Sequence, residues 1–227
     1  MINGIINIYK ERGYTSHDVV AKMRGILRQR KIGHTGTLDP DAEGVLPVCL
    51  GSATKLCDMM TDKSKEYQAV LLLGVSTDTQ DITGKIMEER SVECDEEEIR
   101  AVISSFIGQY MQIPPMYSAL KVNGQKLVDL ARAGIEIERK ARPVEIFNIQ
   151  IQEINLPRVR FLVHCSKGTY IRTLCADIGE KLGCLGTMES LIRTRVASFT
   201  LENAISLDQL EKARDADEVG KYIIHTE

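Results

Sequence analysis

Residues 31–51 read KIGHTGTLDPDAEGVLPVCLG, and this stretch joins a glycine-containing loop to an apolar run. Asp39 lies among turn-forming residues, shortly before the apolar segment from Val45 to Leu50. Gly33 and Gly36 precede it, and glycine allows a positive φ and a close approach to a ligand. One interpretation is a surface turn built on Asp-Pro. The other is a catalytic loop followed by a short buried strand.

The length and composition fit one soluble globular domain. The chain has 227 residues, of which 43% are hydrophobic and 27% charged, and a chain of this size buries a substantial core. No apolar run is long enough to cross a bilayer. The N-terminus lacks the basic and apolar regions of a secretory signal, so we expect a cytoplasmic protein that does not use a membrane.

The cysteines and histidines do not form metal-ligand motifs. The six cysteines include no C-x-x-C pair, and the four histidines are scattered along the chain. A zinc site therefore has little support. Because the chain is too long to need a disulfide scaffold, we expect reduced, mostly buried thiols and no bound metal.

Charge is unevenly distributed although the totals nearly balance. The chain has 29 Lys and Arg against 32 Asp and Glu, a net charge of -3. Basic residues nevertheless gather directly before the loop and again near the C-terminus: Lys22, Arg24, Arg28, Arg30, Lys31, Arg193 and Arg195. Such groups are either solvated faces of helices or contacts to nucleic-acid phosphates, and the charge pattern alone favours solvated faces.

Periodicity predicts a mixture of strands and helices. Strands are expected in apolar, β-branched segments: residues 4–9, 67–73, 144–154 and 159–165. Helices are expected from a 3.6-residue period or capping signals: residues 14–29 with Ser16 as N-cap, 95–108, 169–183 and 206–223. Asn123-Gly124 predicts a hairpin turn. Because strands and helices do not alternate as βαβ units, we predict an α+β fold with a mixed, mostly antiparallel central sheet flanked by helices and loops.

Several motifs along the chain resemble those of bacterial tRNA pseudouridine synthases of the TruB family. The most specific is GHTGTLDPDAEGVLPVCLGSATK, residues 33–55; KEYQAVLLLG, TDTQDITG, IPPMYSALKVNGQKLVDLAR and CSKGTYIRTLCADIG also match, as does the opening GIINIYKERGYTSHDVV. SLIRTRVASF matches less closely, because Ile192 and Ala197 stand where the family usually has Arg and Gly.

The resemblance implies a pseudouridine synthase fold, with one catalytic domain over residues 1–227. Residues 203–227 form an acidic, helical C-terminal extension in this interpretation. The family's usual small C-terminal RNA-binding domain, of the PUA-like type, is expected to be absent, because the chain stops at Glu227.

The resemblance also implies a reaction. This family converts uridine 55 in the T loop of tRNA to pseudouridine, breaking the bond between ribose C1′ and uracil N1 and rejoining C1′ to C5. The rearrangement needs no redox change and no added group, so one nucleophilic carboxylate can suffice and no cofactor is expected. The target base lies inside a folded tRNA elbow and has to be flipped out for the chemistry.

Five residues receive direct roles from the resemblance. Asp39 is the nucleophile, and Arg172 is the cation that pairs with it and aims it. Tyr67 stacks on the target uracil and can move a proton, although its place in a predicted strand alone favours a core residue. His34 fills the space of the displaced base or stacks on the displaced region, although a lone histidine would favour a loop-capping role. Leu191 packs against that base; plain core is the other interpretation of Leu191.

The remaining candidates are RNA contacts. Gly33 and Gly36 would let the loop approach the RNA backbone. The candidate phosphate contacts are basic side chains: Lys22, Arg24, Arg28, Arg30, Lys31, Lys55, Arg193 and Arg195. Asp41 and Glu43 suggest a paired-carboxylate hydrolase together with Asp39. Alternate residues of a Pro/Gly loop would not obviously flank one bond, so we assign them to a solvated loop or helix cap.

Other functions remain open. A non-catalytic tRNA-binding module or chaperone would keep the basic residues and could lose Asp39. A glycoside or nucleoside hydrolase would use Asp39 with Glu43 and would not need the basic segment. A guide-RNA-dependent synthase would share the chemistry but not the stand-alone action. We expect a monomer that acts on the T stem-loop of tRNA without an obligate protein partner.

Overall fold

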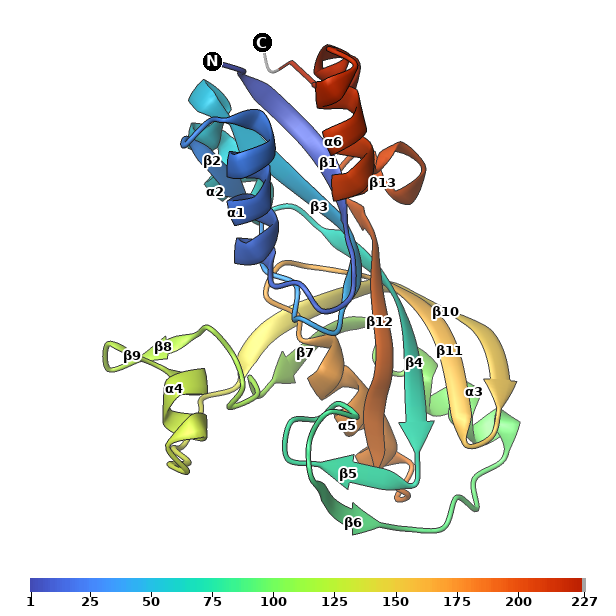
Figure 1. Ribbon diagram of the computed structural model, residues 1–227. Coiled ribbons are helices and arrows are strands. Elements are labelled where there is room, and N and C mark those ends of the chain that lie inside the picture. The colour runs from blue at the N-terminus through green and yellow to red at the C-terminus, as the bar shows by residue number, and fades with distance from the viewer. Residues whose placement is uncertain (226–227) are drawn as a thin grey trace. The chain divides into compact units, whose positions relative to one another are not determined.

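The computed structural model describes residues 1–225 and divides into two compact units (Figure 1). The first unit combines Met1–Tyr67 with the residues from Leu191 onward, and the second is the continuous segment Gln68–Ser190. Strands β4 (Lys65–Leu73) and β12 (Gly186–Val196) contain the points where the chain passes from one unit to the other. The first unit is thus assembled from segments that lie far apart in the sequence.

The first unit is built on β1 (Gly4–Lys10) and β3 (Glu43–Leu50), which pair antiparallel along β1. β2 (Ile32–His34) pairs antiparallel with β3, and the end of β12 pairs with β3 in parallel. The short β13 (Phe199–Thr200) pairs with β12. These pairings place β3 in the middle of the unit's sheet.

Both faces of β3 are covered by apolar side chains. Leu46 and Val48 belong to one buried cluster, and Val45 and Cys49 belong to another. Successive residues of a strand point to opposite faces, so burial on both faces requires a continuous apolar run instead of an alternating one. The segment that follows Asp39 is therefore a buried strand, as predicted.

Helices α1 (Ser16–Leu27) and α6 (Leu207–Asp215) contribute to the first of these clusters. Met23 of α1 and Leu210 of α6 are fully buried there with Ile6 of β1. The C-terminal helix is thus part of the unit's core. The remaining helical segments of this unit are short: η1 (Gly51–Leu56), α2 (Cys57–Thr61), η2 (Leu201–Asn203) and η3 (Val219–Tyr222).

The N-cap of α1 is Thr15, so the prediction of Ser16 is wrong by one residue. The Thr15 hydroxyl accepts a hydrogen bond from the Asp18 N–H (3.0 Å), and Asp18 accepts one from the Thr15 N–H (2.8 Å). This reciprocal capping box satisfies two donors at the start of the helix. Ser16 is the first helical residue, and its hydroxyl is buried.

The second unit contains the strand order β12-β4-β11-β10-β7. β10 pairs antiparallel with β11 on one side and with β7 on the other. Buried and half-buried residues alternate along β4, as expected for a strand with one face on a core. The bounds of the other strands are β5 (Val75–Thr77), β6 (Ile86–Glu89), β7 (Gly108–Gln112), β8 (Lys121–Val122), β9 (Gln125–Lys126), β10 (Arg142–Asn155) and β11 (Arg158–Cys165). The helices are α3 (Glu96–Ser104), α4 (Leu127–Arg132) and α5 (Ile171–Lys181).

The predicted turn and cap in this unit are confirmed. Asn123 and Gly124 both have positive φ and join β8 to β9, as a type I′ hairpin turn requires. Asp95 and Glu98 form the predicted capping box of α3. The helix ends at Ser104 instead of the predicted Gly108, which has a φ of 106° and already begins β7.

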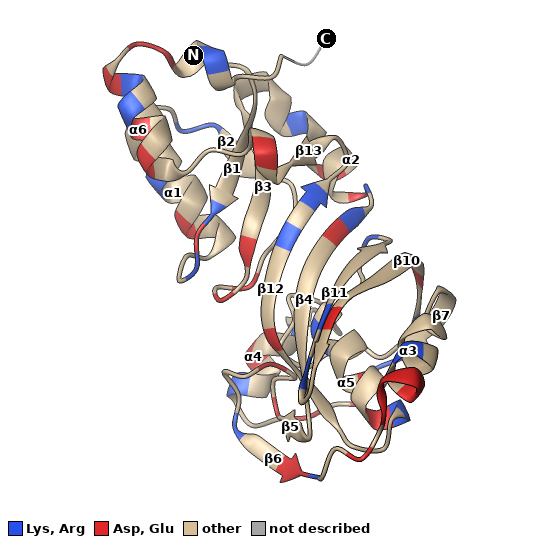
Figure 2. Cartoon of the chain, turned by 90° about the vertical axis from the view of Figure 1, so that its right-hand side faces the viewer, with Lys and Arg blue, Asp and Glu red and all other residues tan. Residues whose placement is uncertain are grey.

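The predicted α+β class with a mixed, mostly antiparallel sheet is confirmed. The pairing of β12 with β3 is parallel, whereas the ladders of β1 with β3, β2 with β3, β10 with β11 and β10 with β7 are antiparallel. All six cysteines are free, as expected. Among residues 1–225, no helix is long and apolar enough to span a membrane. Figure 2 shows acidic residues on α3 and basic residues near the end of β12.

Candidate active site

Asp39 lies between β2 and β3, in residues 35–42, here called the Asp39 loop. Hydrogen bonds fix the residues on each side of it. The Leu38 N–H donates to the buried Ser16 hydroxyl (2.9 Å), and the Gly13 N–H donates to the Pro40 carbonyl (2.8 Å). The Asp39 side chain is half-buried. Its carboxylate is thus carried by a backbone that is held on one side by the first residue of α1 and on the other by the turn before this helix.

Lys10, at the end of β1, supports the same loop from inside the unit. Its side chain is fully buried, and Nζ donates to the carbonyls of Glu11 (3.2 Å), Tyr14 (2.6 Å) and Pro40 (3.1 Å). Burial lowers the pKa of Lys10 to about 8, and nearby carboxylates, Glu43 foremost, oppose the shift. The opening motif of the sequence therefore serves to hold the Asp39 loop.

The prediction that Arg193 contacts RNA phosphates is wrong. Its side chain is 0% exposed, so no phosphate reaches it. Nε donates to the Val45 carbonyl (2.7 Å), and the two terminal nitrogens donate to the carbonyls of Thr37 and Gly36 (3.4 Å each). Burial lowers the pKa of Arg193, and a hydrogen bond with the Tyr67 side chain opposes the shift. Arg193 is a contact of the Asp39 loop inside the protein.

The two glycines of the motif have different local roles. Gly36 has a φ of 126°, a value that residues with a side chain rarely adopt. Gly33 lies in β2, where an added Cβ would come within 3.2 Å of the Cys57 sulfur. Glycine is therefore favoured at position 36 by its conformation, whereas a side chain at position 33 would require the Cys57 sulfur to shift by a few tenths of an ångström. Contact of either glycine with RNA stays a prediction.

Tyr67 and Leu191 are both buried and lie where the chain passes between the units. The first unit consists of two segments of the chain. Tyr67 is the last residue of the first segment, and Leu191 is the first residue of the second. Tyr67 is a hydrogen-bond partner of the buried Arg193. Leu191 lies two residues before that arginine on β12. Their predicted contacts with a flipped base stay predictions.

His34 ends β2 and packs against a second histidine. The rings of His34 and His17 meet edge to face, with centroids 5.0 Å apart and an angle of 82° between their planes. Burial lowers the pKa of His34, and the nearby His17 lowers it further. Near neutral pH His34 therefore presents an uncharged, flat ring, which suits stacking on a base better than pairing with a phosphate.

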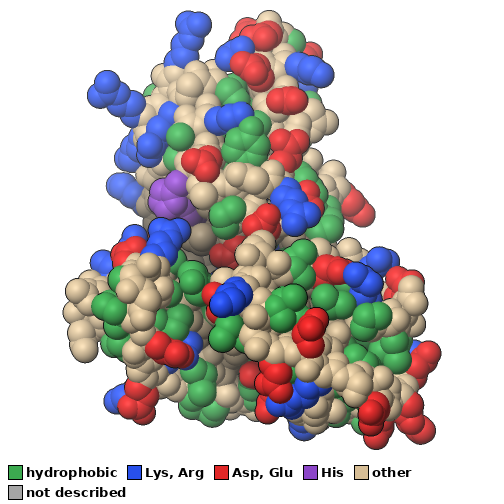
Figure 3. Space-filling model, turned by 60° about the horizontal axis from the view of Figure 1, so that its bottom comes forward, with side chains coloured by type: hydrophobic (Ala, Val, Ile, Leu, Met, Phe, Trp, Pro, Cys, Tyr) green, Lys and Arg blue, Asp and Glu red, His purple; other side chains and the backbone are tan. Residues whose placement is uncertain are grey.

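Most of the predicted phosphate contacts are exposed. They lie on α1, on the segment after it and on η1, and together they are here called the basic surface: Lys22, Arg24, Arg28, Arg30, Lys31 and Lys55. Figure 3 shows Lys and Arg side chains gathered on the side of the molecule that carries α1. Arg195 is half-buried and pairs with Glu66 (3.3 Å). Seven of the eight basic candidates thus retain some exposure, and Arg193 is the exception.

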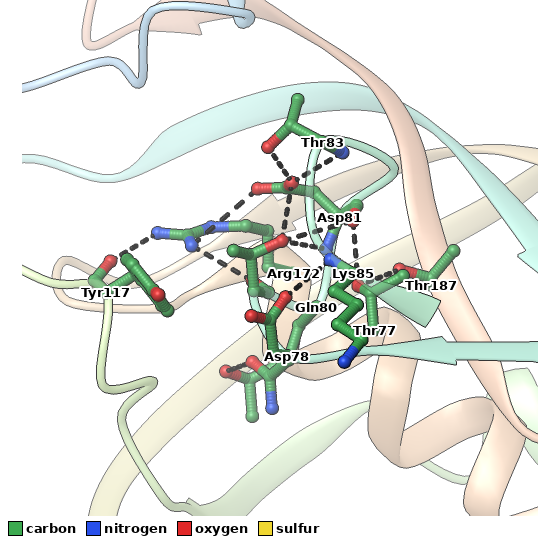
Figure 4. Close-up of polar contacts among 11 residues, drawn as sticks. Thr77, Asp78, Gln80, Asp81, Thr83, Lys85, Tyr117, Arg172 and Thr187 are labelled. Carbon is green, nitrogen blue, oxygen red and sulfur yellow. Dashed lines mark hydrogen bonds and ion pairs between the residues drawn. The ribbon is translucent and has the colours of Figure 1, made fainter. Parts of the chain in front are cut away.

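Arg172 belongs to the second unit and is 6% exposed. It lies on α5, and its terminal nitrogens donate to the carbonyls of Thr79 (3.1 Å) and Tyr117 (2.7 Å). The Asp81 carboxylate lies 3.7 Å from the guanidinium. Figure 4 shows these contacts converging on Arg172 from two loops. Its predicted pairing with Asp39 stays a prediction.

Asp81 is a site residue that the sequence interpretation missed. One of its carboxylate oxygens accepts hydrogen bonds from the Thr79 hydroxyl (2.8 Å) and the Thr83 N–H (3.0 Å), and the other faces Arg172 (Figure 4). These bonds hold the Asp81 side chain in place beside the Arg172 guanidinium. The motif TDTQDITG contained the signal, because Thr and Asp at alternate positions favour side-chain hydrogen bonds to a turn.

Two cavities of the structure lie away from the candidate residues. A cavity of about 420 Å³ in the second unit is lined by Arg90, Cys94 and Cys184 among others, and one of about 270 Å³ in the first unit by Asn7 and Tyr222 among others. Neither is lined by a candidate residue. Within residues 1–225, no group of three or more His, Cys, Asp or Glu is arranged to hold a metal.

Known protein families match almost the whole chain. Residues 24–171 match "TruB family pseudouridylate synthase (N terminal domain)", and residues 172–224 match "tRNA pseudouridylate synthase B C-terminal domain". A tRNA pseudouridine synthase B of Alkaliphilus oremlandii is 53% identical over 218 residues, covering 96% of this chain and 73% of that protein. The protein of the same name from Lachnoclostridium phytofermentans is 59% identical over 219 residues, covering 93% of this chain and 71% of that one.

Solved structures show the same fold. A chain in "Crystal Structure of a Cbf5-Nop10-Gar1 Complex" matches with a TM-score of 0.76 and 34% identity, covering 96% of this chain and 57% of that chain. A chain in "Structure of H/ACA RNP bound to a substrate RNA containing 2'-deoxyuridine" matches with a TM-score of 0.74 and 31% identity, covering 97% and 58%. The present chain thus spans little more than half of these chains, and the predicted fold is confirmed.

Proposed function

Because the chain belongs to the TruB family of pseudouridylate synthases, we propose that it isomerises uridine 55 in the T loop of tRNA to pseudouridine. The bond from C1′ to N1 breaks, the uracil turns, the bond from C1′ to C5 forms, and the proton on C5 leaves. Asp39 is the proposed nucleophile. A nucleophilic carboxylate divides a difficult step into easier ones without a cofactor.

The observation that carries this proposal is the fixed backbone around Asp39. Leu38 is hydrogen-bonded to Ser16, the first residue of α1, and Pro40 is hydrogen-bonded to Gly13 in the turn before this helix. A half-buried carboxylate on an otherwise ordinary surface turn would need no such support. Holding a nucleophile in place is what covalent catalysis requires, because misplacement by about 1 Å can cost on the order of a hundredfold in rate.

The other residues supply recognition in this proposal. The exposed basic surface contacts phosphates and so positions the RNA. The flat, uncharged ring of His34 occupies the space left by the flipped uridine. Tyr67 stacks on the flipped base and Leu191 packs against it, and Arg172 pairs with the nucleophile and aims it.

The test is incubation with an unmodified tRNA transcript and no other RNA or protein, followed by mapping of pseudouridine. We expect the wild-type chain to modify the T loop and Asp39→Asn to lose turnover by on the order of a thousandfold or more. Both proteins should bind the transcript with similar affinity in a filter-binding assay. Asp41→Asn is the matched control, because this exposed carboxylate of the same loop contacts only the exposed Arg12 in the described ion pairs (3.3 Å).

The same experiment separates the alternatives. A binding module would retain the transcript without modifying it. A hydrolase using Glu43 would release free uracil from nucleosides. A guide-RNA-dependent synthase would stay inactive until a guide RNA was added. Near-normal turnover of Asp39→Asn would remove this residue from the mechanism.

A further inference from the structure

Arg193 is a buried charged residue, and a gain in folding stability does not explain its presence there. The side chain is fully buried on β12, and the structure gives it neutral partners: three backbone carbonyls and the Tyr67 phenol. Removing a guanidinium from water is costly, and well-packed apolar residues at such positions often do as well for stability. A buried arginine therefore indicates a task that depends on its geometry.

The contacts of Arg193 lie before and after Asp39 in the chain, at the start of the Asp39 loop and in β3. The terminal nitrogens contact the carbonyls of Gly36 and Thr37, before the nucleophile, and Nε contacts the carbonyl of Val45, after it. One side chain thus links the start of the Asp39 loop to β3, the strand that follows it. The contacts from Ser16, Gly13 and Lys10 reach residues 38 and 40 instead.

The backbone of Arg193 reinforces this link. Arg193 pairs with Gly44 in the parallel register of β12 with β3. An added Cβ on Gly44 would lie 2.3 Å from the Arg193 carbonyl oxygen, so only glycine permits this approach. The arginine is therefore attached to β3 through its backbone and to the Asp39 loop through its side chain.

We infer that Arg193 is a positioning residue, which fixes the Asp39 loop and the Tyr67 phenol in the arrangement needed for turnover and makes no contact with RNA. This inference rests on the proposed function. A planar guanidinium presents several donors in a fixed fork, whereas an ammonium is a point charge on a flexible stem. Lysine at this position keeps the charge but cannot reach Gly36, Thr37 and Val45 in the same geometry.

The test is Arg193→Lys, measured as kcat, KM and filter-binding affinity on a T stem-loop RNA. We expect kcat to fall by roughly ten- to a hundredfold, with the affinity for RNA changed by no more than about threefold, because the phosphate contacts lie elsewhere. Arg214→Lys is the matched control: it makes the same substitution in the same unit, at a partly exposed arginine paired with Glu211 and Asp215. It should leave kcat and affinity unchanged.

A second variant separates positioning from mere packing. Arg193→Ala should lose turnover, and guanidinium or methylguanidinium added well below denaturing concentrations should restore part of it, whereas added ethylammonium should not. Amide exchange of residues 36–42 should be faster in Arg193→Lys than in the wild type, with exchange on α6 unchanged.

The outcomes decide between roles. Wild-type kcat in Arg193→Lys, or an equal loss of kcat and affinity, would overturn the inference. Loss of the whole fold in both variants would also overturn it, since it would make Arg193 a core residue only. If the wild type itself forms no pseudouridine, the proposed function fails first; a working wild type with an unaffected variant leaves that function intact.

Discussion

At the residue scale, Asp81 and Asp78 offer a contrast within one loop. Asp81 faces Arg172, whereas Asp78 accepts a hydrogen bond from the Lys85 N–H (2.8 Å). Asn in place of either removes the charge and keeps an oxygen acceptor. We predict that Asp81→Asn lowers single-turnover rates on T stem-loop RNA by roughly tenfold or more, because the guanidinium loses its carboxylate partner. Asp78→Asn should stay within about threefold of the wild type.

RNA affinity is measured alongside these rates. Equal rate losses in the two variants would show that the loop responds to any loss of charge, and the specific role of Asp81 would be withdrawn.

Lys10 gives a pH-dependent prediction. Its folded pKa of about 8 lies below the unfolded value of 10.5, so between these pH values the unfolded chain holds a proton that the folded protein has lost. The free energy of unfolding therefore rises with pH through this window. We predict that the wild type gains on the order of 2 kcal/mol relative to Lys10→Met between pH 7 and pH 10. Lys63→Met, which removes an exposed lysine, is the control.

Urea titrations at several pH values measure this difference. If the difference in the free energy of unfolding between the wild type and Lys10→Met does not change with pH, the pKa of Lys10 is the same in the folded and unfolded states.

The sequence identified Asp39, Tyr67 and His34 through a specific motif, but it misjudged Arg193. An arginine in a strand is ordinarily exposed, and nothing in the local pattern shows that three carbonyls surround it. Those carbonyls belong to Gly36, Thr37 and Val45. These residues precede Arg193 by about 150 positions in the sequence. Only the pairing of β12 with β3 brings them together.

At the scale of elements, the start of α1 combines two functions in adjacent residues. Thr15 caps the helix, and Ser16 accepts from the Leu38 N–H of the Asp39 loop. Ser16→Ala leaves a buried donor unsatisfied, at a cost of about 1–3 kcal/mol. Thr15→Ala removes the cap, at a cost of about 1 kcal/mol. We predict that both variants lower the melting temperature but only Ser16→Ala lowers turnover, by roughly tenfold.

Thermal unfolding and kcat at a temperature where both variants are folded measure these effects. Equal turnover in the two variants would show that the Leu38 contact does not position the loop.

The cap itself could have been predicted. The residue three positions after Thr15 is Asp18, which completes a capping box, whereas the residue three positions after Ser16 is Val19. The early end of α3 was harder to foresee, because Phe106 and Ile107 continue the apolar content of the helix beyond Ser104. Gly108 marks the strand that follows, not the end of the helix.

At the scale of the whole molecule, the net charge of -3 conceals the local basic surface. We predict that tRNA binding weakens steeply with salt, because each neutralised phosphate releases counterions. Arg30→Gln combined with Lys31→Gln should flatten the slope of log affinity against log salt by roughly 1–2. Arg158→Gln removes an exposed arginine of the second unit and should leave the slope unchanged. An affinity that is flat with salt in the wild type would remove the electrostatic basis of the proposal.

Hydrophobic periodicity and capping signals predicted helices and strands of both units. They did not predict which segments of the chain belong to which unit. Periodicity reports on neighbouring residues, and the core of the first unit joins Ile6 and Ile8 to Leu207 and Leu210. Nothing in either short segment identifies the other as its partner. The sequence therefore could not show that Leu207 and Leu210 of α6 belong to the core of the first unit, and the interpretation as one catalytic domain with a helical extension stays a prediction.

The discontinuous first unit has a consequence for synthesis on the ribosome. Ile5 and Ile224 exchange two backbone hydrogen bonds of 2.8 Å, and Arg193 is translated long after the loop that it holds. Domains tend to fold as units while the chain emerges, so Gln68–Ser190 can fold before the first unit is complete. A nascent chain ending at residue 190 should resist protease over 68–190 while residues 1–67 are digested. Asp39 is therefore translated well before Arg193 and α6, and the first unit can be completed only after residues 191–225 have been made.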